Sequence, residues 1–466
     1  NWIWTRHTGD FSMFRVYASK DNRPAAYSPQ NVPYRPKKHF SISTKGVKEG
    51  DFTMIYGFPG NTQEYILSDA VAYIAERSDP AKIAVRTGRL DIITKAQESD
   101  PALRIHYAAK HASIANAWKK WQGEALGIDR RGTVAAKFDY ETQFGLWSVG
   151  RPEYAGVVMG LRAEYDRIMD AYFAYEITRE TLSTLPAAYT PEERAEECFA
   201  RRKFAEQALW RHAFREYGRC PKVYRTPSYA EGMARYKSPE AYADALFEAV
   251  WEGSDSVAMQ PAVRLREETK RMLDHISWML GTKSLRNLNS KILNELYTTY
   301  IKGLREWDRE RAFYPDANLT LRVAYGSVAG YEYADGEYHK PQTTLDGIIA
   351  KDNPEIYDYD IPQSLRDLYA SKNYGRWGTV IDGRRTVPVC FLATNHTTGG
   401  NSGSPVLNAG GELIGINFDR TWRSTMSDIA FDPAICRNIA VDIRYVLFVV
   451  DRVGGAGYLL KEMTLK

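Results

Sequence analysis

The pattern of apolar and polar residues changes twice along the chain. Residues 1–60 contain short apolar runs closed by glycine and proline, such as "FSMFRVYAS" and "DFTMIYGFPG", which are typical of strands and loops. From about residue 62 to 310, apolar residues recur every three or four positions, which predicts amphipathic helices. After residue 313 the strand pattern returns in "VPVCFLATN", "SPVLN" and "ELIGINF". We therefore expect an α+β protein with a helical block between two β-rich parts.

The helical block shows this period most clearly in five segments. Proline-containing breaks interrupt it at "TLPAAYTPEE" and "YKSPEAY". The apolar run "DIRYVLFVVDRV" near the end of the chain is expected to lead into a last helix. The five segments are residues 64–77, 89–97, 106–126, 160–182 and 290–313.

Composition and charge narrow the functional class. A net charge of +4 over 466 residues is too small to indicate nucleic-acid binding, and no apolar run approaches membrane-spanning length. The chain begins Asn-Trp-Ile-Trp, without an initiator Met or signal peptide, so we expect a mature product, a fragment or the ordered remainder of a longer protein. The cysteines follow no metal-ligand spacing, so no metal or organic cofactor is expected, and their redox state stays open. They are Cys198, Cys220, Cys390 and Cys436.

The strongest chemical motif is "GGNSGSPVLN", residues 399–408. A serine hydroxyl is a poor nucleophile unless it lies on a tight turn beside a base and amide donors. Glycines at 400 and 403 permit such a turn, and the amides of Gly400 and Ser402 could form an oxyanion hole. An ordinary hairpin loop uses the same residue types. Because a strand-like run follows, we favour Ser402 as a nucleophile.

Several long blocks resemble the bacterial dipeptidyl-peptidase 7 and 11 family. They include "NWIWTRHTGDFSMFRVYA", "YGFPGNTQEY", "KHASIANAWKKW", "FYPDANLTLRVAYG" and "TGGNSGSPVLNAGGELIGINFDR". The family comprises serine exopeptidases with a chymotrypsin-like double β-barrel and a helical domain over the cleft. The resemblance implies the end of a first barrel in residues 1–60, the helical domain in 61–312, and the second barrel with a C-terminal helix in 313–466.

The resemblance assigns catalytic roles to two positions. Ser402 matches the nucleophile, and Asp10 in "HTGD" matches the acid that orients the catalytic histidine. His7 and His396 lie near these residues, but the family carries its histidine in a block that does not occur here. We therefore expect the catalytic histidine, with most of the first barrel, to be absent from this chain, which alone should be nearly inert.

The resemblance also implies a substrate-binding group. Asn1, Trp2 and Asp419 match the residues that grip the substrate's free amino terminus, and Asn116 matches one that reaches the peptide backbone. A carboxylate is the expected partner for an ammonium ion. Without the resemblance, core packing is the more common role for Trp2 and Trp4.

Arg420 bears on which dipeptides are released. In the family, arginine at this position accompanies Asp or Glu at P1, and glycine accompanies an apolar P1 residue. A guanidinium binds a carboxylate bidentately, and an apolar P1 would leave it buried and unpaired. A solvated surface arginine is the ordinary alternative. Adjacent residues on a regular strand face opposite sides, so Asp419 and Arg420 share the cleft only if the strand ends or bulges there.

We therefore expect a serine dipeptidyl-peptidase that acts on peptides with a free N-terminus and prefers Asp or Glu at P1. The alternatives are a glutamyl- or chaperone-type endopeptidase, because those enzymes share G-N-S-G-S/G-P, and a catalytically silent peptide-binding homologue. The family implies a periplasmic or outer-membrane-associated location in a Gram-negative bacterium, and a homodimer.

Overall fold

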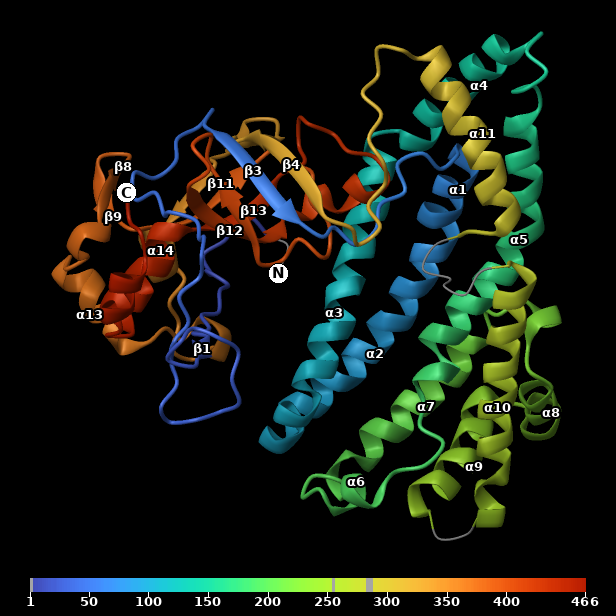
Figure 1. The fold of residues 1–466 in the computed structure, drawn as a ribbon. Helices are drawn as coiled ribbons and strands as arrows, with labels where there is room; N and C mark the ends of the chain where they lie inside the picture. The colour runs from blue at the N-terminus through green and yellow to red at the C-terminus, as the bar shows by residue number, and fades with distance from the viewer. Residues whose placement is uncertain (1–2, 254–255, 282–287) are drawn as a thin grey trace. The chain divides into compact units, whose positions relative to one another are not determined.

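The computed structural model describes residues 3–253, 256–281 and 288–466 and separates the chain into two units (Figure 1). Unit 1 comprises Asn1–Glu64 and Pro315–Lys466, and unit 2 comprises Tyr65–Tyr314. The boundaries fall after Glu64 and Tyr314, next to the positions expected from the change in sequence pattern. The α+β class is confirmed, with strands in unit 1 and long helices in unit 2.

Unit 1 is built around a seven-stranded antiparallel sheet in the order β4-β3-β11-β12-β13-β10-β7. Its members are β3 (Phe52–Gly57), β4 (Arg322–Ser327), β7 (Gln342–Thr344), β10 (Pro388–Ala393), β11 (Ser404–Leu407), β12 (Leu413–Arg420) and β13 (Asn438–Asp442). A bridge between Val328 and Ala393 joins the end of β4 to β10. Beside it, the amide of Thr394 donates to the carbonyl of Ser327 at 2.9 Å. Six of the strands therefore close into a ring.

The interior of this ring is apolar. Each of its six strands, or the residue directly after it, contributes one buried side chain to a single cluster: Ile55, Val328, Phe391, Val406, Ile414 and Ala440. Alternation along each strand places these residues on one face, and their burial stabilises the closed sheet. A second cluster, which includes Val441 and Phe448, packs the other face of the sheet against α14 (Ile443–Phe448).

Strand β3 belongs to the same sheet as the serine motif. It pairs with β4 along its whole length and with β11 through Ile55 and Met54. This differs from the expectation that residues 1–60 end a separate first barrel, because β3 completes the ring between β4 and β11. The described residues of unit 1 form one ring, and a second barrel is not among them.

The remaining elements of unit 1 are short. The segment "FSMFRVYAS" was expected to be a strand, yet only Tyr17–Ala18 pairs, with Val32–Pro33. Its apolar side chains instead approach the C-terminal segment, so the alternation reflects packing without a sheet partner. The short elements are β1 (Tyr17–Ala18), β2 (Val32–Pro33), β5 (Tyr331–Ala334), β6 (Glu337–His339), β8 (Thr379–Ile381), β9 (Arg384–Thr386), α12 (Leu345–Ala350) and α13 (Gln363–Ser371).

Unit 2 is helical in its described part, and each of the five predicted segments contains a helix. The bounds are longer than predicted for α2 and α3 and shorter for α1 and α11. The predicted breaks mark helix starts: Thr190 and Ser238 cap the helices that begin at Pro191 and Pro239. Helices α2 and α3 pack alongside each other (Figure 1). The helices are α1 (Ser68–Tyr73), α2 (Asp79–Ser99), α3 (Pro101–Arg130), α4 (Thr133–Ser148), α5 (Val157–Glu180), α6 (Pro191–Ala195), α7 (Lys203–Tyr217), α8 (Pro227–Tyr236), α9 (Pro239–Glu252), α10 (Ser256–Met279) and α11 (Lys291–Trp307).

No helix in the described ranges has the length and apolar character needed to cross a membrane.

Candidate active site

Ser402 lies on an exposed turn directly before β11. Gly400 and Gly403 flank it with φ of +105° and +84°, values that side chains disfavour. The Ser402 hydroxyl donates to the carbonyl of Phe418 on β12 at 3.3 Å. The turn therefore presents the hydroxyl to solvent, as a nucleophile requires.

The turn is held from two sides. The amide of Gly60, after β3, donates to the carbonyl of Gly399 at 2.6 Å. From β12, the Asn417 carbonyl accepts from the Gly403 amide at 2.7 Å, and the Asn417 side chain donates to the Asn401 carbonyl at 3.2 Å. The "YGFPG" block therefore fixes the serine turn, a role that sequence reasoning missed, although its glycines were a visible signal.

The predicted oxyanion hole has available donors. Within the described part of the chain, the amides of Gly400 and Ser402 donate no hydrogen bond to another protein group, whereas those of Asn401 and Gly403 do. Two unengaged amides beside a nucleophile are the donors that a developing oxyanion needs. Their use in catalysis stays a prediction.

Strand β12 is irregular directly before Asp419 and ends at Arg420. Its pairing with β13 shifts register between Asn417 and Asp419, which marks a β-bulge or a similar irregularity. The Asp419 carboxylate then accepts from the Arg420 amide at 2.8 Å. Asp419 and Arg420 themselves pair in register with Ile439 and Asn438, so the shift precedes both residues and does not by itself turn them to the same face.

Arg420 is buried, so the alternative of a solvated surface arginine is wrong. Its Nη1 and Nη2 atoms donate to the two carboxylate oxygens of Asp428 at 2.6 and 2.9 Å. Nη1 also donates to the Ser427 hydroxyl at 2.9 Å and to the Thr397 carbonyl at 3.3 Å. The sequence argument that an apolar P1 leaves this cation unpaired therefore needs correction, because Asp428 compensates its charge.

Asp10 lies in the same unit as Ser402, and 58% of its side chain is exposed. Its carboxylate contacts Arg6 Nη2 at 3.3 Å. Arg6 Nη1 contacts Asp419 at 3.3 Å. One guanidinium therefore links two of the predicted site residues, and nothing in the sequence pattern singled out Arg6.

His396 is committed to other contacts. Its Nε2 lies 2.9 Å from the Ser427 carbonyl and its Nδ1 lies 3.3 Å from Glu64. Its ring stacks on Phe431 with centroids 4.5 Å apart, and burial lowers its pKa. Both ring nitrogens are engaged away from Ser402, which agrees with its rejection as the catalytic base.

His7 is packed beside α12 within unit 1. A Cβ at Gly347 would lie 1.8 Å from its Nε2, so the ring occupies the space that this glycine leaves. Burial, with a smaller effect from Lys351, lowers its pKa to about 4. His7 is therefore neutral at pH 7, and its packing against α12 agrees with a structural role.

The structure describes only some of the remaining predicted residues. Asn1 and Trp2 lie outside the described residues. Trp4 is buried in the core of unit 1 and donates to the Lys340 carbonyl at 3.0 Å, so the packing alternative holds for it. Asn116 is exposed on α3 of unit 2, and its contact with a peptide stays a prediction. All four cysteines are free thiols in this structure.

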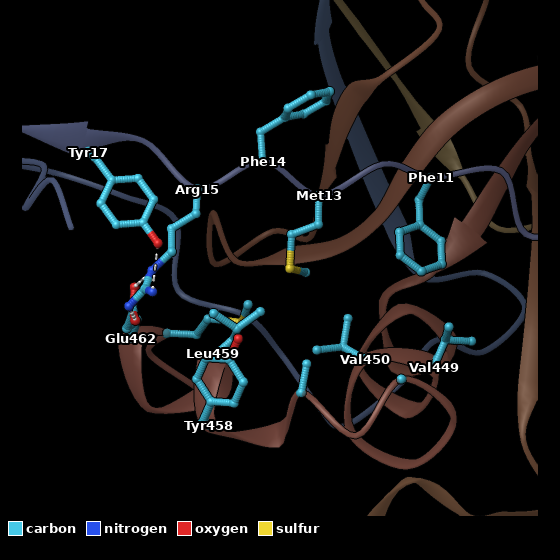
Figure 2. Close-up of a pocket in the computed structure, with 13 residues that line it drawn as sticks. Phe11, Met13, Phe14, Arg15, Tyr17, Val449, Val450, Tyr458, Leu459 and Glu462 are labelled. Atoms are coloured by element: carbon cyan, nitrogen blue, oxygen red, sulfur yellow. Dashed lines mark hydrogen bonds and ion pairs between the residues drawn. The ribbon is translucent and has the colours of Figure 1, made fainter. Parts of the chain in front are cut away.

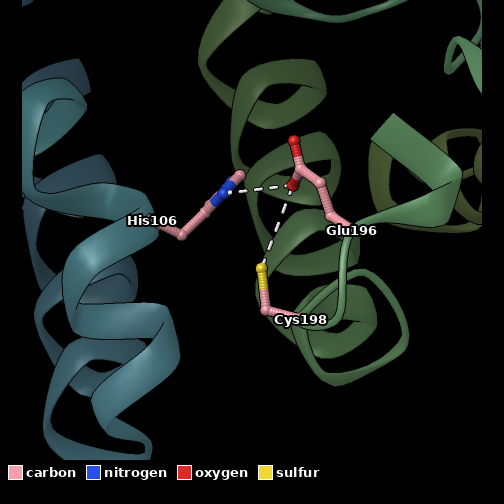
Figure 3. Close-up of side chains that lie close together, drawn as sticks. All are labelled: His106, Glu196 and Cys198. Atoms are coloured by element: carbon pink, nitrogen blue, oxygen red, sulfur yellow. Dashed lines mark hydrogen bonds and ion pairs between the residues drawn. The ribbon is translucent and has the colours of Figure 1, made fainter. Parts of the chain in front are cut away.

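One group of potential metal ligands lies in unit 2 (Figure 3). One ligand atom each from His106, Glu196 and Cys198 lie within 4.8 Å of one another. Arg202 Nη1 lies 2.7 Å from His106 Nε2 and 3.4 Å from Glu196. An arginine only donates, so Nε2 carries the lone pair and Nδ1 the proton, which faces Glu196. The arrangement suits an arginine-centred ion-pair cluster better than a cation site.

An apolar cavity of about 540 Å³ lies in unit 1 between the segment that follows Asp10 and the C-terminal segment (Figure 2). Phe11 and Met13 face Val449 and Val450, and an Arg15–Glu462 ion pair lies at one end. Ser402, Asp419 and Arg420 are not among its described lining residues. It is therefore a feature apart from the serine site.

The chain is similar to known dipeptidyl-peptidases in sequence and in structure. A family model described as Peptidase S46 matches residues 1–198 and 193–465. An Asp/Glu-specific dipeptidyl-peptidase of Capnocytophaga gingivalis is 40% identical, over all of this chain and 70% of that protein. Dipeptidyl-peptidase 7 of Phocaeicola vulgatus is 33% identical over the same shares. The crystal structure of Porphyromonas endodontalis DPP11 with the dipeptide Arg-Glu matches with a TM-score of 0.84 and 32% identity, covering 100% of this chain and 72% of that one.

Proposed function

The chain belongs to the peptidase S46 family, and on this premise we propose that it releases dipeptides from the free N-terminus of peptides, with Asp or Glu at P1. Four consecutive residues of β12 carry the proposal. Asn417 holds the serine turn, Phe418 accepts from the Ser402 hydroxyl, and Asp419 and Arg420 follow with opposite charges. The nucleophile is thus hydrogen-bonded to the strand that carries an anion and a cation.

The proposed reaction is acyl transfer through Ser402. Its hydroxyl attacks the carbonyl carbon of P1 while a histidine base takes the proton, and the amides of Gly400 and Ser402 bind the oxyanion. The leaving amine accepts that proton, and water then hydrolyses the acyl-enzyme. Asp10 is assigned to orient the base, which we place outside residues 1–466, because the His7 ring is packed at Gly347 of α12 and both ring nitrogens of His396 are engaged.

Substrate recognition is proposed to use two charges. Asp419, with Asn1 and Trp2, would bind the ammonium of the first residue, and Arg420 would bind the side-chain carboxylate of the second. Asn116 would contact the peptide backbone. An N-terminal cap removes the ammonium, so it separates this exopeptidase from an endopeptidase.

The test is a panel of fluorogenic dipeptides on the complete protein. It compares free-amine substrates ending in Asp, Glu or Leu with an N-acetylated Asp substrate. Fast release from free-amine Asp and Glu alone supports the proposal, whereas cleavage of the acetylated substrate indicates an endopeptidase. Binding without turnover indicates a silent homologue.

A variant pair tests Arg420 within the same panel. Because Arg420→Gly alone leaves Asp428 buried without its cation, it is combined with Asp428→Asn. We expect loss of acidic P1 cleavage and a gain for Leu. Arg385→Ala, an exposed arginine of unit 1, is the matched control and should leave the preference unchanged.

The proposal also covers the barrel architecture, the cellular location and the oligomeric state. They are a chymotrypsin-like double β-barrel to which unit 1 contributes its ring, a periplasmic or outer-membrane-associated location, and a homodimer. Light scattering of the complete protein tests the dimer, and cell fractionation tests the location.

A further inference from the structure

The guanidinium of Arg6 lies between two carboxylates of the proposed site. Its Nη2 is 3.3 Å from Asp10 Oδ2, and its Nη1 is 3.3 Å from Asp419 Oδ2. Only 9% of the Arg6 side chain is exposed, against 14% for Asp419. This nearly buried cation therefore bridges the acid assigned to the base and the acid assigned to the substrate ammonium.

Arg6 is itself fixed by several groups of unit 1. Its Nε donates to the Thr8 hydroxyl at 2.8 Å, and its guanidinium lies 5.2 Å from the centre of the Phe418 ring. Its carbonyl accepts from the Thr343 hydroxyl at 2.6 Å, and that hydroxyl accepts from the Cys390 amide on β10. These contacts connect Arg6 to β7, β10 and β12, so its position is set by the seven-stranded sheet.

Asp419 is thereby held through both of its oxygens. Oδ1 accepts from the Arg420 amide at 2.8 Å, and Oδ2 faces Arg6. A carboxylate oxygen has two lone pairs, so each can still accept from a ligand ammonium. A carboxylate with a fixed orientation loses less conformational freedom on binding than a mobile one.

The charges of Arg6, Asp10 and Asp419 also bear on how the ammonium is bound. Asp10 and Asp419 share one guanidinium, which can neutralise only one of the two carboxylates. If the guanidinium is removed, the two carboxylates lose their shared partner and repel each other, so Asp419 loses its fixed position. Asp419 would then present a weaker or misplaced anion.

We propose that Arg6 is a positioning residue that fixes Asp419 for the substrate ammonium and ties it to Asp10. The inference rests on the proposed function, because it assumes that Asp419 binds that ammonium. It assigns Arg6 no contact with the reacting atoms.

The experiment measures binding of the free-amine dipeptide Arg-Glu by calorimetry, so it does not depend on turnover. Arg6→Met is expected to weaken binding about 10-fold. Arg6→Lys should lose less, about 3-fold, because an ammonium can reach one carboxylate but lacks the fork that spans both. Arg15→Met is the matched control: it removes an ion pair to Glu462 from the same N-terminal segment and should bind as the parent does.

A double-mutant cycle separates positioning from general loosening of the structure. In an Asp419→Asn background, Arg6→Met should weaken binding less than about 2-fold, because the group that it positions is already changed. Equal losses in both backgrounds, or unchanged or tighter binding by Arg6→Met, would overturn the proposal. If Arg6→Met does not fold, the test rests on Arg6→Lys. Parent-like affinity of Arg6→Lys for the dipeptide then overturns the proposal.

The acetylated dipeptide distinguishes failure of the premise from failure of the inference. If the parent protein binds N-acetyl-Arg-Glu as tightly as Arg-Glu, the ammonium site itself is wrong, and the inference falls with it. If the parent prefers the free amine and Arg6→Met retains that preference and affinity, only the role of Arg6 is wrong.

Discussion

Asp428 binds both terminal nitrogens of Arg420, at 2.6 and 2.9 Å, in a nearly buried ion pair. The two residues are eight positions apart, joined by the 3₁₀ turn Trp422–Asp428 that follows β12. This turn returns the chain so that the carboxylate meets the guanidinium. The cation proposed to select acidic P1 residues is therefore held in place before any substrate arrives.

We expect Asp428→Asn to destabilise the protein by about 3 kcal/mol, because it leaves a buried guanidinium without its counter-charge. Urea unfolding at pH 7 measures the change. Asp382→Asn is the control: its pair with Lys340 is largely exposed, so the loss should be about 0.5 kcal/mol or less. Equal unfolding midpoints for the Asp428 variant and the parent would contradict the importance of this pair.

Gly60→Ala should impair catalysis through the serine turn. A Cβ at Gly60 would lie 2.6 Å from the Gly399 carbonyl, which is backbone and can move only with the turn. A displacement of this kind near the oxyanion amides is expected to lower kcat about 100-fold. Gly399→Ala is the matched control, since its Cβ would meet nothing within 4 Å and should leave kcat near the parent value. Steady-state kinetics of the complete protein on a Glu substrate compares them, and similar kcat values for both variants would contradict the bracing role.

His7 predicts a pH dependence of stability. Burial lowers its pKa from 6.5 to about 4, so between these values the unfolded chain binds a proton that the folded chain does not. The free energy of unfolding should therefore decrease as pH falls from 6.5 towards 4. His7→Gln removes this titration, so its urea midpoint should change less between pH 7 and pH 5 than that of the parent. His39→Gln, which alters an exposed histidine, should keep the parent's difference. Parallel behaviour of the His7 variant and the parent would exclude this assignment.

The sequence by itself determined the features that depend on local pattern. The helical period of residues 62–310, the strand runs around Ser402 and the turn-forming glycines follow from neighbouring residues, and the structure contains them. The adjacency of Asp419 and Arg420 raised the expectation of a strand end or bulge, and β12 shifts register directly before Asp419 and ends at Arg420. Local geometry limits such features so strongly that a few residues suffice to predict them.

The tertiary structure alone decided which distant residues meet. It brought β3 into the sheet of the serine turn, paired Arg420 with Asp428, engaged both nitrogens of His396, and placed Arg6 between Asp10 and Asp419. Arginines and aspartates are common on protein surfaces, so their types carry no sign of a partner. Their roles come from burial, which removes competing water and makes each charge depend on one specific neighbour.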